Sequence, residues 1–343
     1  MKYIKRFNVL NEFNNFIFDD TNTPNVSLIE ELEQPENLAF ISLMPHNYSN
    51  DYLTFIPVED STFGFTKAGL SYSTDKGSTW TALEANGTTP TVTAGSKILW
   101  KGTPTPSSRD GIGRFTSSKN FDAQGNIMSL LFGDNFASQT SLSGKNHVFL
   151  RLFSISKVRN AENLVLPATM LASNCYDKMF YSCTSLYTTP ELPATTLADY
   201  CYYQMFNGCT SLAAAPIMPA TTLAQSCCYQ MFQGCTSLTS APELPATTLA
   251  EKCYYQMFQE CTRLTTAPAL PATTLASNCY KFMFSYCSSL NYVKMLATDI
   301  SASSCLYYWL SDVAATGTFI KADGVTIPSG VSGIPNGWTV ETV

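Results

Sequence analysis

The sequence predicts an α+β multidomain protein, in which a β-sandwich is followed by an α/β solenoid with terminal caps. Near-copies of a 26-residue unit fill residues 166–295, and short alternating apolar and polar runs fill 52–139. Degenerate copies flank the repeats at 140–165 and 296–343. Self-similarity at such a period marks a solenoid, in which each unit buries its apolar face against its neighbours. We therefore expect an N-terminal attachment module (1–51), an Ig-like or jelly-roll-like β-sandwich (52–139) and a solenoid (140–343).

The repeat unit has an apolar pattern that recurs every four residues. Units start at Leu166, Leu192, Met218, Leu244 and Leu270, each 26 residues after the last (192 − 166 = 26). In the fourth unit Leu249, Cys253, Met257 and Cys261 follow the four-residue recurrence. This pattern predicts one apolar stripe of a short helix.

Capping residues and prolines set the expected limits of each element. Thr247 or Thr248 is placed to cap the start of the helix, and Gly208 and Gly234 stand where glycine commonly ends one. A Thr/Ala run closed by Pro268 then predicts a short strand or extended segment. A helix and a short strand stacked at this period are the plan of a leucine-rich repeat.

The 12 cysteines all lie between 175 and 305, and eleven of them occupy two positions of the repeat. A disulfide ladder is one reading of this pattern. We favour the other, in which cysteine serves as a small hydrophobic residue in a tight core, and which implies folding in a reducing compartment. No Cys-x-x-Cys spacing occurs, so we expect no zinc site, no other metal and no cofactor.

The phrase Gly-Cys-Thr-Ser-Leu at 234–238 follows a Tyr/Phe-rich segment. With its copies it resembles the BspA-like leucine-rich repeats of Bacteroidales and of their phages and prophages. The resemblance covers roughly residues 147–343 and implies adhesion or ligand recognition rather than catalysis. The Pro-Ala-Thr-Thr-Leu phrase and the 26-residue period depart from that family's pattern and indicate a distinct subgroup. The opening MKYIKRF and the segment 24–27 are similar to the starts of Bacteroides phage structural proteins.

The region 52–139 contains a second, shorter resemblance. Residues 73–80, STDKGSTW, resemble the Asp-box of sialidases and other β-propellers. In that motif the aspartate and glycine shape a hairpin turn, and the tryptophan packs beneath it. A propeller carries several copies, whereas this chain carries one. We therefore expect a structural hairpin here and no sialidase site.

Charge and hydropathy exclude several classes of protein. The net charge is −6 and only 13% of residues are charged. The first 51 residues hold eight acidic and three basic residues, a net charge of −5. The chain has no basic patch, so we expect no nucleic-acid partner. It has no run of 18 apolar residues, so we expect no membrane span. It has no signal-peptide pattern, so either export does not use that route, or a signal has been removed, or the protein folds and is assembled in the cytoplasm.

Catalytic motifs are scarce. The two histidines, His46 and His147, fall in different modules, which disfavours a Ser-His-Asp or Cys-His site. Ser73-x-x-Lys76 matches the penicillin-binding-protein string, but falls in the expected hairpin turn rather than at a helix start. No nucleotide-binding motif occurs. We therefore expect a protein that is not an enzyme; a carbohydrate-active enzyme is the remote alternative.

Exposed repeat positions that differ between units form the candidate ligand surface. The principal candidates are Tyr187, Thr188, Glu191, Tyr203, Gln204, Gln230, Ser240, Glu243, Gln256 and Tyr292. Further variable positions are Ala213, Ile217, Thr266, Phe282 and Met295. Rows of tyrosine and glutamine can stack on and hydrogen-bond to glycans or protein loops.

The hypothesis that follows is a virion fibre, decoration or host-recognition protein that folds in the host cytoplasm. Residues 1–51 would attach it to other virion proteins, and the solenoid would display a surface to a host glycan or protein. The alternative is a cell-surface adhesin of Bacteroidales. Either protein could be a homo-oligomer.

Overall fold

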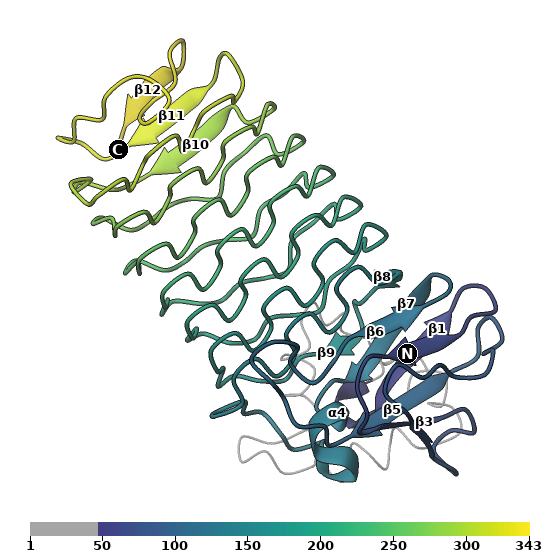
Figure 1. Cartoon of the computed structure of the whole chain (residues 1–343). Coiled ribbons are helices and arrows are strands. Elements are labelled where there is room, and N and C mark those ends of the chain that lie inside the picture. The colour runs from purple at the N-terminus through teal and green to yellow at the C-terminus, as the bar shows by residue number, and fades with distance from the viewer. Residues whose placement is uncertain (1–46) are drawn as a thin grey trace, which may run out of the picture. The chain divides into compact units, whose positions relative to one another are not determined.

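The computed structural model describes residues 47–343. The predicted attachment module therefore lies almost wholly outside the described residues. Tyr48–Val343 form one compact unit, in which a β-sheet region is followed by stacked coils of chain (Figure 1). Within the described residues, helix is confined to α4 (Ser129–Phe132) and the 3-10 turns η2 (Tyr48–Asn50) and η3 (Gly133–Asn135).

The sheet region contains a seven-stranded mixed sheet and a two-stranded ribbon. The sheet has the order β4-β3-β5-β1-β7-β8, and β9 also pairs with β7; the ribbon joins β2 and β6. The strands are β1 (Leu53–Pro57), β2 (Phe63–Phe65), β3 (Leu70–Ser73), β4 (Thr81–Leu83), β5 (Ile98–Gly102), β6 (Phe115–Ser117), β7 (Phe121–Asn126), β8 (Val158–Asn160) and β9 (Leu164–Val165). The sheet's pairs are antiparallel, except that β8 and β9 run parallel to β7.

Aromatic rings fill the space between the sheet and the ribbon. Phe55 of β1 lies 4.7–5.8 Å, between ring centroids, from five other rings. These belong to Phe63, Trp100, Phe115, Phe121 and Phe153. The alternating pattern of the strands sends these side chains to one face of each strand, and that face is buried.

The predicted hairpin at the Asp-box resemblance is present. β3 and β4 pair antiparallel on either side of residues 74–80. The Asp75 carboxylate accepts hydrogen bonds from the Thr79 backbone N–H (2.9 Å) and the Thr79 hydroxyl (2.6 Å). Ser73 also donates to it, at 2.7 Å. These bonds fix the turn and lower the pKa of Asp75 to about 2.

The repeats form stacked coils, but the predicted helices are wrong. Each coil instead has a run of tight turns, at 172–183 in the first full repeat and at 26-residue spacing after it. Along this run, backbone N–H groups alternate between bonds within their own coil and bonds to the next coil. Met179 N–H donates to Tyr176 O three residues back, whereas Phe180 N–H donates across to Met205 O in the next coil. An α-helix cannot supply such cross-coil bonds, because all of its N–H groups point along its own axis.

Within each turn run, every fourth residue has a left-handed backbone, and this makes the run possible. The equivalent residues of four successive coils adopt φ between 52° and 55°; they are Lys178, Gln204, Gln230 and Gln256. Such a conformation costs a non-glycine residue roughly 1–2 kcal/mol, and the cross-coil hydrogen bonds offset that cost. Gly208 and Gly234, expected to end helices, occupy the last left-handed position of their runs, with φ 74° and 71°. The threonines expected to cap helices therefore have no helix to cap.

The second half of each coil is extended, as predicted, and pairs in parallel with its neighbours. Isolated bridges join Ala214 to Ser240 and Thr266 to Tyr292. From residue 166 onward, regular strands appear only at the C-terminal end, as β10 (Tyr292–Met295), β11 (Thr318–Lys321) and β12 (Thr339–Thr342), which form a parallel sheet (Figure 1). The terminal β-structure expected within 296–343 is therefore formed.

The sheet continues into the coils without a break in pairing. β8 and β9, from the degenerate copy 140–165, pair with β7, and Tyr187 of the next coil donates its N–H to Arg159 O of β8. Residues 147–156 of the same copy make a turn run, with left-handed φ at His147, Arg151 and Ile155. We call residues 140–165 the first coil. The sheet therefore covers the end of the solenoid that an isolated first coil would leave open.

Candidate recognition surface

Two exposed faces of the coils hold the sequence-predicted candidates. We call the exposed side of the turn runs the turn face. It holds Tyr203, Gln204, Gln230 and Gln256. We call the exposed side of the extended segments the extended face. It holds the remaining candidates, which are Tyr187, Thr188, Glu191, Ser240, Glu243 and Tyr292. The two groups therefore lie on different halves of the coils.

Tyrosines stack in a row on the turn face. The ring centroids of Tyr203 and Tyr229 are 4.8 Å apart, and those of Tyr229 and Tyr255 are 4.5 Å apart. Ammonium groups lie over both ends of this tyrosine ladder, with Lys178 Nζ 4.6 Å from the Tyr203 ring and Lys281 Nζ 5.7 Å from the Tyr255 ring. Burial between neighbours raises the pKa of Tyr229. Because the rings cover one another's faces, only their edges and hydroxyls remain for a ligand.

Amide side chains form two further rows beside the tyrosines. Gln204 donates to Gln230 at 2.5 Å, and Gln230 donates to Gln256 at 2.9 Å. Asn207, Gln233 and Gln259 make the same bonds at 3.0 and 2.9 Å. Such ladders of stacked amides stabilise stacked strands. The turn-face candidates therefore already use part of their hydrogen-bonding capacity to bind adjacent coils to one another.

The cysteines line the core beneath the turn face. All twelve are unpaired and buried, as favoured over the disulfide ladder. In the row Cys183, Cys209, Cys235, Cys261 and Cys287, each thiol donates to a phenylalanine carbonyl of the preceding coil, at 2.9–3.2 Å. Burial raises the pKa of Cys235 to about 12. These thiols are packed and protonated, so they are not nucleophiles.

The extended face carries less regular side chains. Ile217 has 78% of its surface exposed and Tyr187 has 44%, although both are large apolar residues. Glu191, Ser240 and Glu243 are also exposed. Thr188 is committed to structure, because its hydroxyl donates to Asn160 Oδ1 at 2.6 Å and accepts from Ala161 N–H. Met295, counted among the variable surface positions, is instead fully buried, because it belongs to the inner face of β10.

A proline-lined pocket of about 280 Å³ lies on the extended face between two coils. Its walls include Pro242, Pro245, Pro268 and Pro271, with the candidate Glu243 between them. Proline has no N–H group and cannot extend a hydrogen-bonded ladder. The corner is therefore held together by packing, and it leaves a shallow apolar site with one carboxylate.

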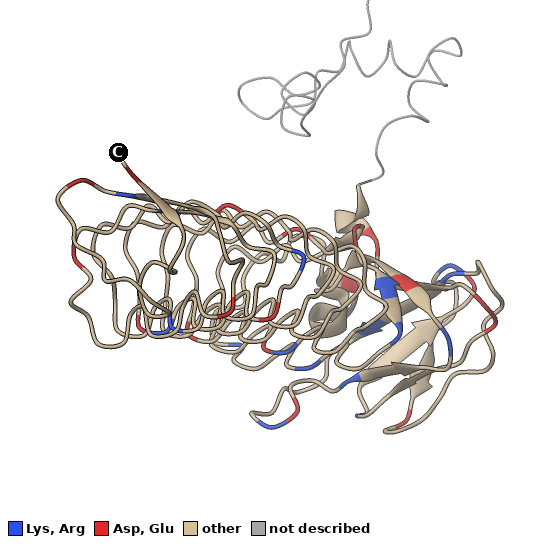
Figure 2. Ribbon diagram, turned by 90° about the horizontal axis from the view of Figure 1, so that it is seen from above, with Lys and Arg blue, Asp and Glu red and all other residues tan. Residues whose placement is uncertain are grey.

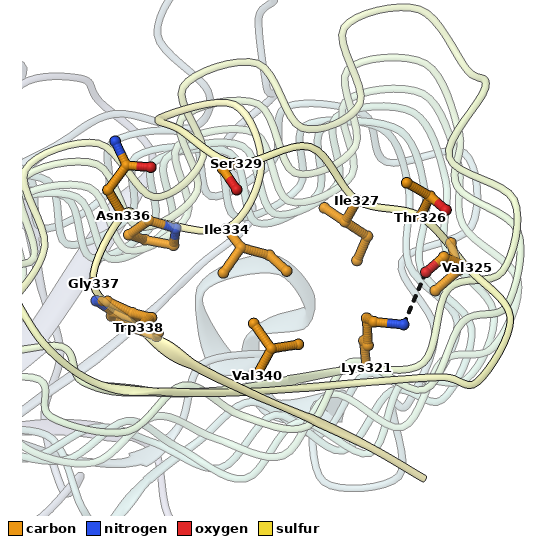
Figure 3. A pocket seen from close by; sticks show the side chains of 11 residues that line it. Lys321, Val325, Thr326, Ile327, Ser329, Ile334, Asn336, Gly337, Trp338 and Val340 are labelled. Atoms are coloured by element: carbon orange, nitrogen blue, oxygen red, sulfur yellow. Dashed lines mark hydrogen bonds between the residues drawn. The ribbon is translucent and has the colours of Figure 1, made fainter.

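A second pocket, of about 410 Å³, lies in the C-terminal cap (Figure 3). Ile327, Ile334 and Val340 give it apolar walls. The Lys321 ammonium donates to Val325 O at 2.9 Å. The sequence did not indicate this pocket, because a loop after β11 folds back over the strands to make it.

Within residues 47–343, the sequence motifs weighed for catalysis are not assembled into a site. His46 lies outside the described residues, and the Nδ1 atom of His147 is buried without a hydrogen-bond partner. Ser73 Oγ is engaged by Asp75 and by Gly77 N–H within the hairpin turn. Among residues 47–343, no cluster of three or more metal-ligating side chains occurs. No helix in this part of the chain is long and apolar enough to cross a membrane.

Comparison of the chain with known protein families, with curated proteins and with solved structures found no match.

Proposed function

We propose that this chain is a non-enzymatic recognition protein that displays its solenoid as a binding surface. The observation that carries the proposal is a contrast within the repeat. The buried positions are nearly identical from coil to coil, whereas the exposed positions of the extended face differ. One such row reads Glu191, Ile217, Glu243, Ala269 and a second reads Thr188, Ala214, Ser240, Thr266, Tyr292. A uniform core under a varied surface suits a scaffold for ligand recognition.

The stacking of the coils supports such a role, because it makes the extended face rigid. Phenylalanine rings stack from Phe153 through Phe180, Phe206, Phe232 and Phe258 to Phe284, with centroids 5.3–5.6 Å apart. Cross-coil hydrogen bonds follow the same direction. A rigid surface loses little conformational entropy on binding. We place the ligand site along the extended face around Tyr187, Ile217 and Glu243, next to the proline-lined pocket.

In this proposal the setting is a virion, as a fibre, decoration or host-recognition protein attached through residues 1–51. It rests on the sequence resemblance and on the acidic N-terminal segment. Twelve unpaired thiols fit a protein that folds in a reducing host cytoplasm. A surface adhesin of Bacteroidales would have the same extended face and would differ in its attachment.

The pockets described above also favour recognition over glycoside hydrolysis. Glycosidases use a pair of carboxylates that flank the bond to be cleaved. The proline-lined pocket presents Glu243 alone, and the C-terminal pocket contains neither aspartate nor glutamate.

The binding test uses the full chain, labelled and offered to Bacteroidales cells and to a printed glycan array. We expect saturable binding that is lost in a triple variant of the extended face, Tyr187→Ala, Ile217→Ser and Glu243→Lys. The matched control is Gln230→Ala on the turn face, which should bind as the parent does. Equal loss in both variants, or no binding to either probe, would overturn the proposal.

The attachment test compares the full chain with residues 48–343, which form a compact unit of their own. Both should bind the same cells, and only the full chain should co-sediment with the particle or envelope fraction to which it belongs. Co-sedimentation with phage particles supports the virion setting, and co-sedimentation with outer membranes supports the adhesin. Equal co-sedimentation of the two chains would contradict attachment through the N-terminal segment.

A further inference from the structure

Three cationic side chains converge on a pocket of about 370 Å³ between the sheet region and the first coil. Its lining residues are Thr66, Lys67, Asp110, Arg114 and Arg151. Thr66 and Lys67 follow β2, and Asp110 and Arg114 belong to the loop between β5 and β6. Arg151 comes from the turn run of the first coil. The pocket is therefore a composite of sheet and solenoid.

Backbone contacts fix this arrangement. Ile112 N–H donates to Val148 O at 3.0 Å, and Phe115 N–H donates to Leu152 O at 2.8 Å, which joins the loop to the first coil. Gly111 approaches that coil so closely that a Cβ atom on it would lie 2.6 Å from His147 O. On the other wall, Arg114 N–H donates to Thr66 Oγ1 at 2.9 Å. The side chains that line the pocket thus project from a rigid frame.

The polar groups of the pocket differ in how many hydrogen-bond partners they have. Lys67 Nζ donates to Ser107 Oγ at 3.0 Å and to Gly111 O at 2.8 Å, which leaves one N–H free. The guanidinium groups of Arg114 and Arg151 have no hydrogen-bond or ion-pair partner in the described part of the chain, and neither has the Asp110 carboxylate. Among the lining residues, three cations against one carboxylate give a net charge of +2. The Asp177 carboxylate, outside the lining, also interacts electrostatically with Arg151. A site with this surplus of N–H donors suits an oxyanion.

This positive site is unusual in an acidic protein. Residues 48–165 hold 11 basic and 9 acidic residues, a net charge of +2, whereas residues 166–343 hold 6 and 10, a net charge of −4. Figure 2 shows Lys and Arg more densely placed in the sheet region than along the coils. The local field therefore attracts an anion to this end of the compact unit, although the whole chain has a charge of −6.

We propose that this pocket binds the carboxylate of an acidic sugar residue, of the uronic acid type. The two arginines and Lys67 hold the carboxylate, and the unpartnered Asp110 carboxylate accepts hydrogen bonds from sugar hydroxyls. Small-molecule pockets span roughly 300–1,000 Å³, so this one suits a single sugar residue. The inference goes beyond the proposed function, because it adds a second site away from the extended face, and it rests on that function in assuming a glycan partner.

Calorimetric titration of the full chain with sodium glucuronate tests this, with glucose and sodium acetate as comparison ligands. We expect glucuronate to bind more tightly than either. Arg114→Gln and Arg151→Gln should each weaken its binding about tenfold, as expected for the loss of a charge-assisted hydrogen bond. The control is Arg109→Gln, because Arg109 is an exposed neighbour outside the pocket lining. Circular dichroism of each variant checks its fold.

The role of Asp110 has its own variant. Asp110→Ala should weaken glucuronate binding relative to acetate binding. Removing the carboxylate charge favours both anions alike, whereas only the sugar loses an acceptor for its hydroxyls. Acetate binding as tight as glucuronate binding would overturn the sugar assignment. Glucuronate affinity that survives both arginine substitutions, or no saturable binding, would overturn the site itself. If glucuronate fails while the extended-face variant still abolishes cell binding, this inference falls and the proposed function stands.

Discussion

The sheet region and the repeats bury aromatic rings in different ways. In the sheet region Phe55 contacts five other rings, which come from four different strands and from the first coil. In the repeats Phe232 stacks only on Phe206 and Phe258, at 5.6 Å on each side. The first core is a network that depends on contacts distant in sequence. The second is a row of nearest neighbours, whose stability is close to a sum over coils.

The ring of Phe153 in the first coil links the aromatic contacts of the two cores. It lies 5.8 Å from Phe55 and 5.7 Å from Phe115 in the sheet region, and 5.3 Å from Phe180, with which the stacked row continues. The row of stacked rings in the repeats therefore begins against the sheet core. A change in the sheet should affect the first coil, whereas a change deep in the repeats should stay local.

Alkaline pH should produce the largest difference in stability between the sheet region and the repeats. Burial raises the pKa of Cys175, Cys183 and Cys235 from 9.0 to about 12. The folded state therefore keeps protons that the unfolded chain releases above pH 9. The stability that each such thiol contributes is complete below pH 9 and falls by about 1.4 kcal/mol per pH unit towards pH 12.

All cysteines lie in the coils from residue 175 onward, so the repeats should unfold first as pH rises. Hydrogen exchange read by mass spectrometry, corrected for the intrinsic rate at each pH, should show loss of protection in the repeats before the sheet region. Loss of protection in both regions at one pH would contradict the comparison.

Phe55→Ala should be the most damaging single substitution of the comparison. It removes a ring that contacts five others, and a fully buried phenylalanine typically contributes 3–5 kcal/mol relative to alanine. We expect about 4 kcal/mol of destabilisation by urea unfolding, with loss of protection that extends into the first coil. An effect confined to β1 would show that the sheet core is less connected than its ring contacts indicate.

Phe232→Ala makes the matched change in the repeats. We expect about 3 kcal/mol of destabilisation, restricted to the coils on either side. Buried thiols report this directly, because a protonated, buried thiol is alkylated only when its coil opens. Labelling by iodoacetamide should rise at Cys209, Cys235 and Cys261 and stay low at Cys175 and Cys287. A uniform rise along the chain would mean that the repeats open as one unit.

Gln230→Ala tests the amide ladder on the turn face. It removes hydrogen bonds to Gln204 and Gln256, which are half-buried, and should destabilise the protein by about 1 kcal/mol. Thermal unfolding measures the change. The control is Thr239→Ala on the opposite half of the coil, because Thr239 is exposed and its hydroxyl makes a single hydrogen bond, to Ala213 O. No difference between the two variants would show that the ladder is not a source of stability.

Acid should loosen the Asp75 hairpin in the sheet region. The pKa of Asp75 is lowered to about 2 by its hydrogen bonds with Thr79 and Ser73. The bonds therefore support the turn above about pH 4 and are lost as pH falls towards 2. The amide resonance of Thr79, followed by NMR, should titrate over this range in the native protein and not in Asp75→Asn. A titration that persists in the variant would assign the effect to another group.

The repeat itself could be predicted from the sequence, because Cys, Met and Phe recur at intervals of 26 residues. Which positions are buried also followed, since the side chains at 253, 257 and 261 had to share one face. The hairpin at 73–80 was equally local: a short motif and the two strands beside it suffice to make the turn.

The conformation of the turn run did not follow from the pattern. Leu249, Cys253, Met257 and Cys261 recur at intervals of four, whereas a helix turns once every 3.6 residues. Over three intervals a helix would rotate the last of these by about 120° from the first. The strict interval of four is therefore a signal against a helix. Lys252 and Gln256 have a left-handed backbone, which their residue types do not indicate.

The sequence shows which surface residues form rows, but it does not show what those residues contact. The sequence identifies Gln204, Gln230 and Gln256 as a row, but only the stacking distance makes them hydrogen-bond to one another rather than to a ligand. The pocket of Lys67, Arg114 and Arg151 has no sequence signal, because its members come from three separate segments. The sequence alone determined the period, the buried positions and the hairpin, since these depend on neighbours along the chain. Tertiary structure alone decided the direction of each N–H group, the joining of sheet to coil and the meeting of three cations, since these depend on which coil lies beside which.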